Sequence, residues 1–205
     1  MLFRCAAALA IALLLCTPVN AAEVGFRDLL RNPGTPLAGA SDADVIIVMY
    51  ADYNCGYCKR MEPVLASALK TDSRLAVVHK EWPIFGGASA YAARVALAAN
   101  YQGRYDAVHS AFMRSPTRLS DEDIVDAIAK KAGVDWARLS NDMMVHRRDI
   151  DAILARNARE ASLLALEGTP GLVINGYLLR GALSDDQLKQ VLQKIRAAET
   201  SPSTS

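Results

Sequence analysis

The sequence predicts an α/β fold in which a block of helices interrupts a small sheet. Three observations indicate it. Apolar, β-branched runs at 45–50 and 75–79 flank a helical pattern, helical spacing continues from 88 to 166, and short apolar runs return on both sides of a tight turn after residue 170. The order is therefore β-α-β, helical block, β-hairpin and final helix. The 205 residues are enough for one domain with its own core.

The first 21 residues have the pattern of an export signal. Arg4 gives a short basic start, residues 5–16 are apolar throughout, and small residues follow up to Ala21, near which we expect cleavage. The apolar run is too short for a convincing membrane span. Lipidation at Cys16 is a less favoured alternative, because Leu15 stands where such sites have a small residue.

Charge and cysteine content narrow the function of the processed chain. Removing Arg4 from the 23 basic residues leaves 22, against 22 acidic ones. This neutrality argues against nucleic acid or an anionic membrane as the main partner. Export places the chain where disulfides persist. Only Cys55 and Cys58 of the four cysteines remain after the leader, and a secreted protein that uses disulfides for stability carries more.

Residues 22–44 are predicted to be a lead-in with a short helix at 24–30, and residues 45–87 to be the first part of the core. Within that part, residues 45–50 form a buried strand, an amphipathic helix begins around Cys58, and a second strand follows at 75–79. The chain leaves the sheet at 80–87. Trp82 and Phe85 there form either an exposed apolar patch that grips unfolded clients or part of the core.

Cys55-Gly56-Tyr57-Cys58 lies at this strand-to-helix junction and carries the chemistry. The unpaired N–H groups and the dipole of a helix N-terminus favour negative charge, so we expect Cys55 to be partly ionised. The thiolate is the form that attacks disulfides. Cys58 is near enough to close a disulfide with Cys55 or to resolve a mixed disulfide. The motif therefore indicates a redox-active dithiol.

Two alternatives rank below a redox dithiol. A structural disulfide between cysteines three apart would restrict the unfolded chain very little. A zinc site needs two more ligands, and His79, His109 and His146 show no short ligand spacing. We therefore expect no metal and place zinc last.

Residues 88–166 are predicted to be a helical insertion with three helices. The first covers 90–101, the second begins at Ser120 and ends at Gly133, and the third begins at Asn141 or Asp142 and ends at Gly168. Residues 167–199 complete the core with a hairpin around a type I′ turn at 175–176 and a helix opened by a capping box at 184–187. Residues 200–205 are predicted to be disordered.

Without the helical block, this order is that of a thioredoxin-like core. The chain resembles the DsbA-like family of exported thiol–disulfide oxidoreductases, which have a thioredoxin-like fold with an inserted α-helical domain, and within it the branch of ScsC and Com1-type proteins. The resemblance spans nearly all the mature chain in the family's order. The residues that carry it are Ala51–Lys59, Glu81–Ile84, Ser89, Ala92–Arg94, Gly168–Gly171 and Val173–Gly176.

The resemblance implies that the Thr169–Pro170 bond is cis and faces the dithiol. A cis proline there bares the backbone of Thr169 for pairing with a client peptide, and Thr169 can tune the thiolate. Gly56 and Tyr57 are implied to set the redox poise. Many relatives carry a buried acid where this chain has Met49. Asp52 and Glu81 are the candidates for proton transfer to Cys58 through water, although we slightly prefer that both are solvated charges.

The expected function is a periplasmic thiol–disulfide oxidoreductase in which Cys55 exchanges and Cys58 resolves. Its partners would be exported proteins with thiols or disulfides and a membrane redox partner, with no cofactor and no membrane span in the mature chain. Introducing disulfides is the first choice of direction, and isomerase or reductase activity is the runner-up. A copper- or zinc-binding module without turnover and a holdase that uses Trp82 and Phe85 are the alternatives from other classes.

Overall fold

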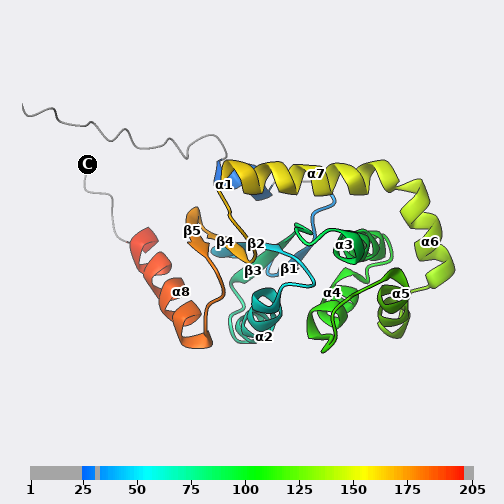
Figure 1. Ribbon diagram of the computed structural model, residues 1–205. Helices are drawn as coiled ribbons and strands as arrows, with labels where there is room; N and C mark the ends of the chain where they lie inside the picture. Colours follow the sequence, from blue (N-terminus) through cyan, green and yellow to red (C-terminus); the bar gives the residue numbers. More distant parts are fainter. Residues whose placement is uncertain (1–24, 31–32, 201–205) are drawn as a thin grey trace, which may run out of the picture.

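The structure, a computed structural model, describes residues 25–30 and 33–200 (Figure 1). The predicted signal peptide at 1–21 and the tail from 201 lie outside the described residues. The elements follow in the predicted general order. They are α1 (Phe26–Leu30), β1 (Leu37–Gly39), β2 (Val45–Ala51), α2 (Gly56–Thr71), β3 (Leu75–Glu81), α3 (Gly87–Asn100), α4 (Tyr105–Arg114), α5 (Glu122–Lys131), α6 (Trp136–Val145), α7 (Arg147–Leu163), β4 (Gly171–Ile174), β5 (Tyr177–Arg180) and α8 (Asp185–Thr200).

A five-stranded mixed sheet with the order β1-β3-β2-β4-β5 organises the molecule. The parallel pair β2–β3 is central and almost wholly buried, which is why both strands are continuous apolar runs. The other pairs are antiparallel. Strand β1 lies inside the predicted lead-in and was not predicted, because three residues that mix exposed and half-buried positions give no strand pattern.

Helices cover both faces of this sheet (Figure 1). Alternate residues of β2 point to opposite faces. Ile47 and Met49 pack with α2 and α8 in the larger core, which continues into the helical block, whereas Val48 and Tyr50 pack with α1 and the end of α7 in a smaller one. The N-terminus of α2, where the dithiol lies, follows directly after the central strand β2.

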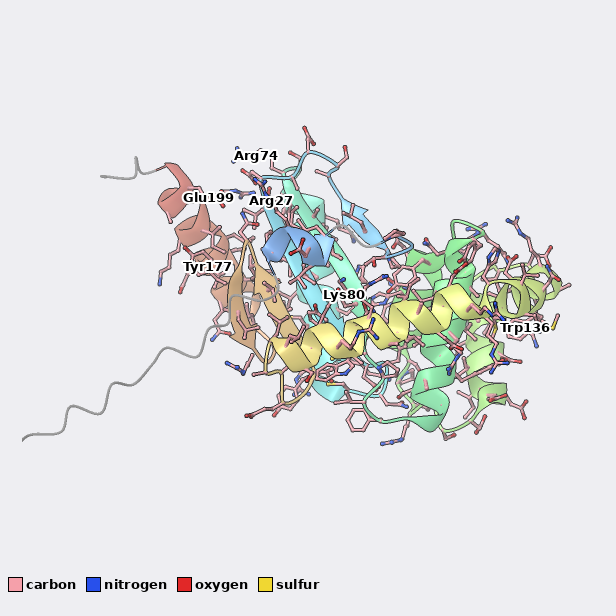
Figure 2. The ribbon with its side chains drawn as sticks, turned by 90° about the horizontal axis from the view of Figure 1, so that it is seen from above. Arg27, Arg74, Lys80, Trp136, Tyr177 and Glu199 are labelled. Carbon is pink, nitrogen blue, oxygen red and sulfur yellow. The ribbon has the colours of Figure 1, made fainter. Side chains whose placement is uncertain are left out.

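A buried charge joins α7 to the sheet. The ammonium of Lys80 is fully buried and lies 2.9 Å from Oε2 of Glu160 on α7. The hydroxyl of Tyr50 donates to the same oxygen at 2.9 Å. Figure 2, which looks down onto α7, places Lys80 beside that helix. Because a buried charge needs a partner, this pair fixes where α7 crosses the sheet.

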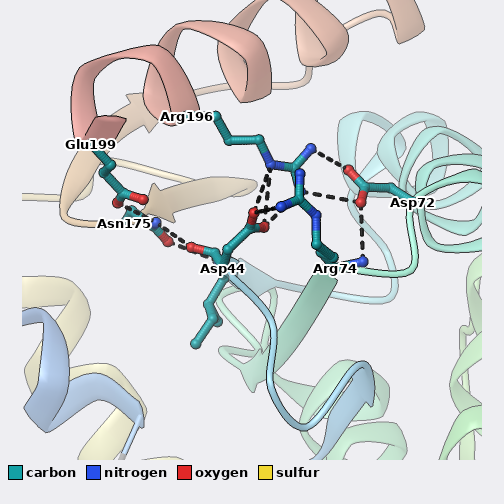
Figure 3. A network of polar contacts seen from close by, with 7 residues as sticks. Asp44, Asp72, Arg74, Asn175, Arg196 and Glu199 are labelled. Carbon is teal, nitrogen blue, oxygen red and sulfur yellow. Dashed lines mark hydrogen bonds and ion pairs between the residues drawn. The ribbon is translucent and has the colours of Figure 1, made fainter. Parts of the chain in front are cut away.

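A polar network fastens α8 to the base of the sheet (Figure 3). Arg196 donates to Oδ1 of Asp44 at 2.7 Å and to Oδ2 of Asp72 at 2.7 Å, so it bridges the start of β2 and the end of α2. Asn175 in the hairpin turn donates to the carbonyl of Asp44 at 2.8 Å and to Glu199 at 2.7 Å. The bridge lowers the pKa of Asp44 and of Asp72 through the hydrogen bonds from Arg196.

Replacing Arg196 by methionine is expected to lower the free energy of unfolding at pH 7 by about 1 kcal/mol, because the bridge is partly exposed and solvent screens it. Lys194→Met, on the exposed side of the same helix, serves as the control and should change stability little. Urea denaturation measures both. Since the lowered carboxylate pKa values contribute stability only while these groups are ionised, the difference should shrink as pH falls below 3.8. A difference independent of pH would contradict this account.

The helical block differs from its prediction in three places. Asp121, rather than Ser120, caps α5, since its Oδ1 accepts from the backbone N–H of Ile124 at 2.9 Å. Asn141 and Asp142 do not open a helix but lie within α6, and α7 starts after a break at His146. A separate helix, α4, spans residues 105–114, where the sequence predicts helical character but no helix bounds.

The hairpin is confirmed in detail. Ile174 pairs with Tyr177 across a two-residue loop. Asn175 and Gly176 have φ values of +44° and +91°, the left-handed conformation that a type I′ turn needs at both positions. Ser184 and Gln187 form the predicted capping box at the start of α8.

Candidate active site

The turn between β2 and α2 places both cysteines as the sequence predicts. Cys55 is the N-cap of α2, and its Sγ accepts a hydrogen bond from the backbone N–H of Cys58 at 3.3 Å. Both cysteines are free thiols. Cys55 is 5% exposed and Cys58 is fully buried. The arrangement leaves only the first sulfur accessible to another molecule.

The two sulfurs have opposite acidities. The pKa of Cys55 is lowered to about 5 by a hydrogen bond from the Cys58 side chain, by the Thr169 side chain and by the N–H groups of Cys58 and Tyr57, against the opposing effect of burial. Burial raises the pKa of Cys58 far above its usual value, and the neighbouring Cys55 raises it further. A thiolate next to a protonated thiol is the arrangement that disulfide exchange requires.

The loop before β4 lies against the dithiol, as the resemblance implies. The Thr169–Pro170 bond is cis. In the thiol form, Sγ of Cys55 donates to the carbonyl oxygen of Thr169 at 3.1 Å. Tyr57, Thr169, Pro170 and Arg180 line an open recess of about 410 Å³ at this point. Backbone exposed beside a reactive sulfur can pair with an extended peptide.

Thr169→Val is expected to raise the pKa of Cys55. Oγ1 of Thr169 is buried and has no partner among the described residues while Cys55 is a thiol, so the hydroxyl is available to the thiolate. Losing one charge-assisted hydrogen bond costs about 1.5 kcal/mol, which corresponds to about one pKa unit. Alkylation rate against pH measures the change. Thr169→Ser keeps the hydroxyl and should keep the midpoint near 5. An unchanged midpoint in the valine variant would remove Thr169 from this role.

The aromatic residues of the dithiol motif and of the segment after β3 differ in exposure. Tyr57 is 60% exposed and lies under the guanidinium of Arg60, 4.2 Å from the ring centre. Phe85 is 50% exposed, with Arg118 stacked over it. Trp82, by contrast, packs partly buried against the smaller core and meets the ring of Tyr50 edge-on. Each of the two alternatives for this segment therefore holds for one residue. Phe85 is on the surface, and Trp82 belongs to the core.

The preference for Asp52 as a solvated charge is wrong. Asp52 is buried, and its carboxylate accepts from the backbone N–H groups of Asn54 and Phe85 and from the hydroxyl of Ser89. Its carbonyl accepts from the N–H of Cys55 at 3.1 Å. These contacts show that Asp52 shapes the turn that presents Cys55, because all its oxygens are occupied by that loop and its neighbours.

Glu81 is also buried, which corrects the same preference. Its Oε1 accepts hydrogen bonds from the hydroxyls of Tyr53, two residues before Cys55, and Tyr105 on α4. Both hydroxyls also contact Nδ1 of His109, at 3.0 and 3.2 Å. On its other side, His109 lies 3.2 Å from Oε2 of Glu62, one turn after Cys58 on α2. The cluster thus links the active-site turn, α2 and β3 to the helical block.

Electrostatics set the protonation of this cluster. Burial favours neutral His109, but the carboxylates of Glu62 and Glu81 outweigh it and raise the pKa of His109 to about 9. His79, whose ring centre is 4.3 Å from that of His109, has its pKa lowered to about 3 by burial and by the neighbouring cation. The result is a buried anion–cation–anion arrangement beneath the dithiol helix.

Little in the amino-acid sequence indicates this cluster. Glu62 follows Cys58 by four positions, so an acid on the buried face of α2 was the one available sign. His79 and His109 are thirty residues apart in the chain, and only the packing of α4 against α2 and β3 brings them together. The carboxylate of Asp52 accepts from Asn54, Phe85 and Ser89 and not from the cluster, so the loop reaches the cluster through Tyr53, whose hydroxyl donates to Glu81. Within residues 25–30 and 33–200, no group of three or more histidine, cysteine or acidic side chains could hold a metal ion.

Known proteins with this arrangement are thioredoxin-like. A thioredoxin-like oxidoreductase from Silicibacter pomeroyi DSS-3 is 34% identical, superposes with a TM-score of 0.79, and is matched over 84% of this chain and 98% of its own. The catalytic domain of Proteus mirabilis ScsC is 30% identical with a TM-score of 0.75, over 83% of this chain and 94% of its own. These matches confirm the predicted thioredoxin-like fold with its helical insertion.

Curated relatives show the same similarity inside longer proteins. The Na(+)/H(+) antiporter NhaA 3 of Salinispora tropica is 28% identical over 204 residues, which are 97% of this chain and 30% of that protein. The chain thus spans less than a third of the length of the curated relatives that it matches first. In the described part of the chain, no helix has the length and apolar character needed to cross a membrane.

The match that identifies the family covers far more of the chain than the cysteine motif. The DSBA-like thioredoxin domain matches residues 46–193, which run from the central strand through the helical block to α8. This range includes the dithiol, the cis-proline loop and the buried cluster. The chain belongs to the DSBA-like thioredoxin domain family, a family of thiol–disulfide oxidoreductases.

Proposed function

We propose that the chain is an exported oxidoreductase whose dithiol, Cys55 and Cys58, forms or exchanges disulfides in other exported proteins. The observation that carries this proposal is the environment of Cys55. Its sulfur caps a helix, has a pKa lowered to about 5, and lies beside the cis-proline loop. The fully buried Cys58, held as a thiol, suits the resolving role.

In the forward direction, a client thiolate attacks Sγ of Cys55 in the Cys55–Cys58 disulfide. The new bond joins the client to Cys55, and Cys58 leaves and takes up a proton. A second thiolate of the same client then attacks the client sulfur of this mixed disulfide. The client disulfide forms, and Cys55 leaves as a stable thiolate. The client loses two electrons, which the dithiol gains. A low pKa at Cys55 favours the last step, because a more acidic thiol is the better leaving group.

Residues around the dithiol support this cycle. Thr169 offers its backbone to the client and its hydroxyl to the thiolate, while Pro170 in its cis form keeps that backbone exposed. Gly56 and Tyr57 form the first turn of α2, where the N–H of Tyr57 stabilises the thiolate. Proton transfer to Cys58 has two candidates, Asp52, whose backbone hydrogen-bonds the Cys58 thiol, and Glu81, which is linked to the active-site turn through Tyr53.

The pKa also bears on the direction. Thioredoxin combines a pKa of about 7 with about −270 mV, and DsbA combines about 3.5 with about −120 mV. A pKa of about 5 lies between them, so a potential between these two values is expected. A dithiol of this poise oxidises reduced clients yet still exchanges wrong disulfides. We therefore keep disulfide formation as the first direction, with isomerase or reductase activity at the same site as the alternative.

Export and a partner that recharges the dithiol complete the proposal. The leader pattern at 1–21 supports a periplasmic location, and a catalytic oxidant needs a partner that accepts its electrons. The family's usual arrangement, exported substrates and a membrane redox partner, supplies both.

The test is equilibration of the purified protein in glutathione buffers, combined with oxidative refolding of a reduced client and with insulin reduction. We expect a potential between those of thioredoxin and DsbA and catalysis of refolding. Excess chelator is included in every assay, and activity that persists in it counts against a metal-binding module. A protein that catalyses neither refolding nor insulin reduction would overturn the proposal.

A further inference from the structure

A second recess begins at the dithiol, separate from the one at the cis-proline loop. It has a volume of about 840 Å³ and extends along α2 from Gly56, between the two cysteines, to Lys70. The α2 residues that line it recur at helical spacing, so they form one face of the helix. The opposite wall is the end of α4 and the turn after it, from Ser110 to Pro116. Over this length, about 21 Å of helix, an extended peptide has room for about six residues.

The recess carries a local excess of positive charge. Lys59, Lys70 and Arg114 line it, and none of them has a carboxylate within ion-pair distance among residues 25–30 and 33–200. The ammonium of Lys59 is instead held by two carbonyl oxygens, of Ser115 at 2.8 Å and Thr117 at 3.3 Å, which leave its charge uncompensated. Other basic residues, such as Lys80, Arg94 and Arg196, are paired.

The single acid of the lining does not cancel this charge. Glu62 faces inward, where His109 pairs with one of its oxygens and Ser110 donates to the other at 3.2 Å. The first turn of α2 carries no acidic residue. The whole chain has a formal charge of only +1, so the positive recess reflects local placement and not a basic protein. The positive charges therefore face whatever enters the recess.

We propose that this recess binds an acidic segment of the client and so selects clients with aspartate or glutamate within about six residues of the reacting cysteine. The inference rests on the proposed function, because selection acts on exchange at Cys55. A client bound at Cys55 lies between the two recesses, since Gly56 lines one and the next residue, Tyr57, lines the other. Its backbone pairs at Thr169, and its charged flank lies along Lys59, Arg114 and Lys70.

The test uses the Cys58→Ser protein, which stops after the first exchange. Synthetic peptides carry one cysteine as a mixed disulfide with 2-mercaptoethanol. The Cys55 thiolate attacks the peptide sulfur, the Cys55–peptide disulfide forms, and 2-mercaptoethanol leaves as the thiolate, so no other oxidant is needed. One peptide has glutamates on one side of the cysteine, and its partner has glutamines at the same positions. Mass spectrometry measures the rate of adduct formation.

We expect the glutamate peptide to react about three- to tenfold faster at low salt, with the advantage lost near 1 M salt. The double variant Lys70→Glu/Arg114→Glu should abolish or reverse the preference. The matched control, Lys189→Glu/Lys194→Glu, changes the net charge equally but on α8, where both side chains are exposed, and should keep it.

Bis(2-hydroxyethyl) disulfide, which is small and neutral, separates the two proposals. A protein that does not react with it lacks the proposed exchange chemistry. A protein that reacts with it but treats the two peptides alike contradicts the acidic-segment inference alone. An equal loss of preference in the α8 control would also overturn the inference, because the effect would then come from net charge and not from the recess.

Discussion

Cys55→Ser is expected to abolish thiol–disulfide exchange and to remove all rapid alkylation of the native protein at pH 5. With a pKa of about 5, half of Cys55 is ionised at that pH, whereas about one in 10⁴ molecules of an ordinary thiol of pKa 9 is ionised. A less basic thiolate is intrinsically slower, by a factor of about 60 for four pKa units. The net advantage is therefore about 80-fold at pH 5 but close to onefold at pH 7.

This calculation decides how the measurement is made. Iodoacetamide alkylation should be followed from pH 3.5 to 8, where the native protein should reach its plateau above about pH 6. The Cys58→Ser variant is the matched control, and it should still react at low pH because its nucleophile is present. Its midpoint should move upward, since the hydrogen bond from Cys58 is the largest cause of the low pKa of Cys55. If Cys55→Ser kept either rapid alkylation at low pH or exchange activity, Cys55 would not be the nucleophile.

The fold could be predicted where the pattern was local. The apolar β2 and β3, the Asn175-Gly176 turn and the capping box at Ser184 each follow from adjacent residues. The helical block was less predictable, because its boundaries depend on tertiary contacts. Asp121 competes with Ser120 for the cap, and the break at His146 interrupts a pattern that reads as one long helix.

The site shows the same division. Cys55 and Cys58 were placed by their spacing after a strand, and Thr169-Pro170 by its resemblance to a family. The burial of Asp52 and Glu81 could not be predicted from the sequence, since a charged residue near a strand end is usually solvated. Their burial depends on partners from distant parts of the chain: Ser89 for Asp52, and Tyr105 with His109 for Glu81. Such compensation is visible only once the helical block is packed on the core.

That packing makes a strong prediction for His109. His109→Phe is expected to lower the free energy of unfolding at pH 7 by about 3 kcal/mol, because it leaves Glu62 and Glu81 buried without their shared cation. Chemical denaturation measures it. His146→Phe is the control: this histidine is partly exposed and stacks on Tyr101, so a change below about 1 kcal/mol is expected.

The pH dependence identifies the cause. The pKa of folded His109, about 9, exceeds its unfolded value of 6.5, so its contribution is complete below pH 6.5 and is lost as pH rises through 9. His79 acts oppositely: its folded pKa, about 3, lies below 6.5, so the unfolded chain binds the extra proton and stability falls as pH drops below 6.5. These two histidines alone therefore give a stability maximum near pH 6.5, whereas the lowered pKa of Cys55, about 5, opposes the alkaline decline in the dithiol form, because the unfolded thiol keeps its proton up to about pH 9.

The contribution of Cys55 is common to His109→Phe and the native protein and cancels in their comparison, so the difference in stability between them is largest below pH 6.5 and shrinks above pH 9. Should this variant not fold, Glu62→Gln gives a second route, because losing one carboxylate should lower the pKa of His109 and shift the alkaline midpoint downward. NMR titration of the two rings in the native protein provides the direct measurement. A pKa near 6.5 for His109 would show that the cluster carries no buried cation, and the link between the dithiol helix and the helical block would then be one of packing alone.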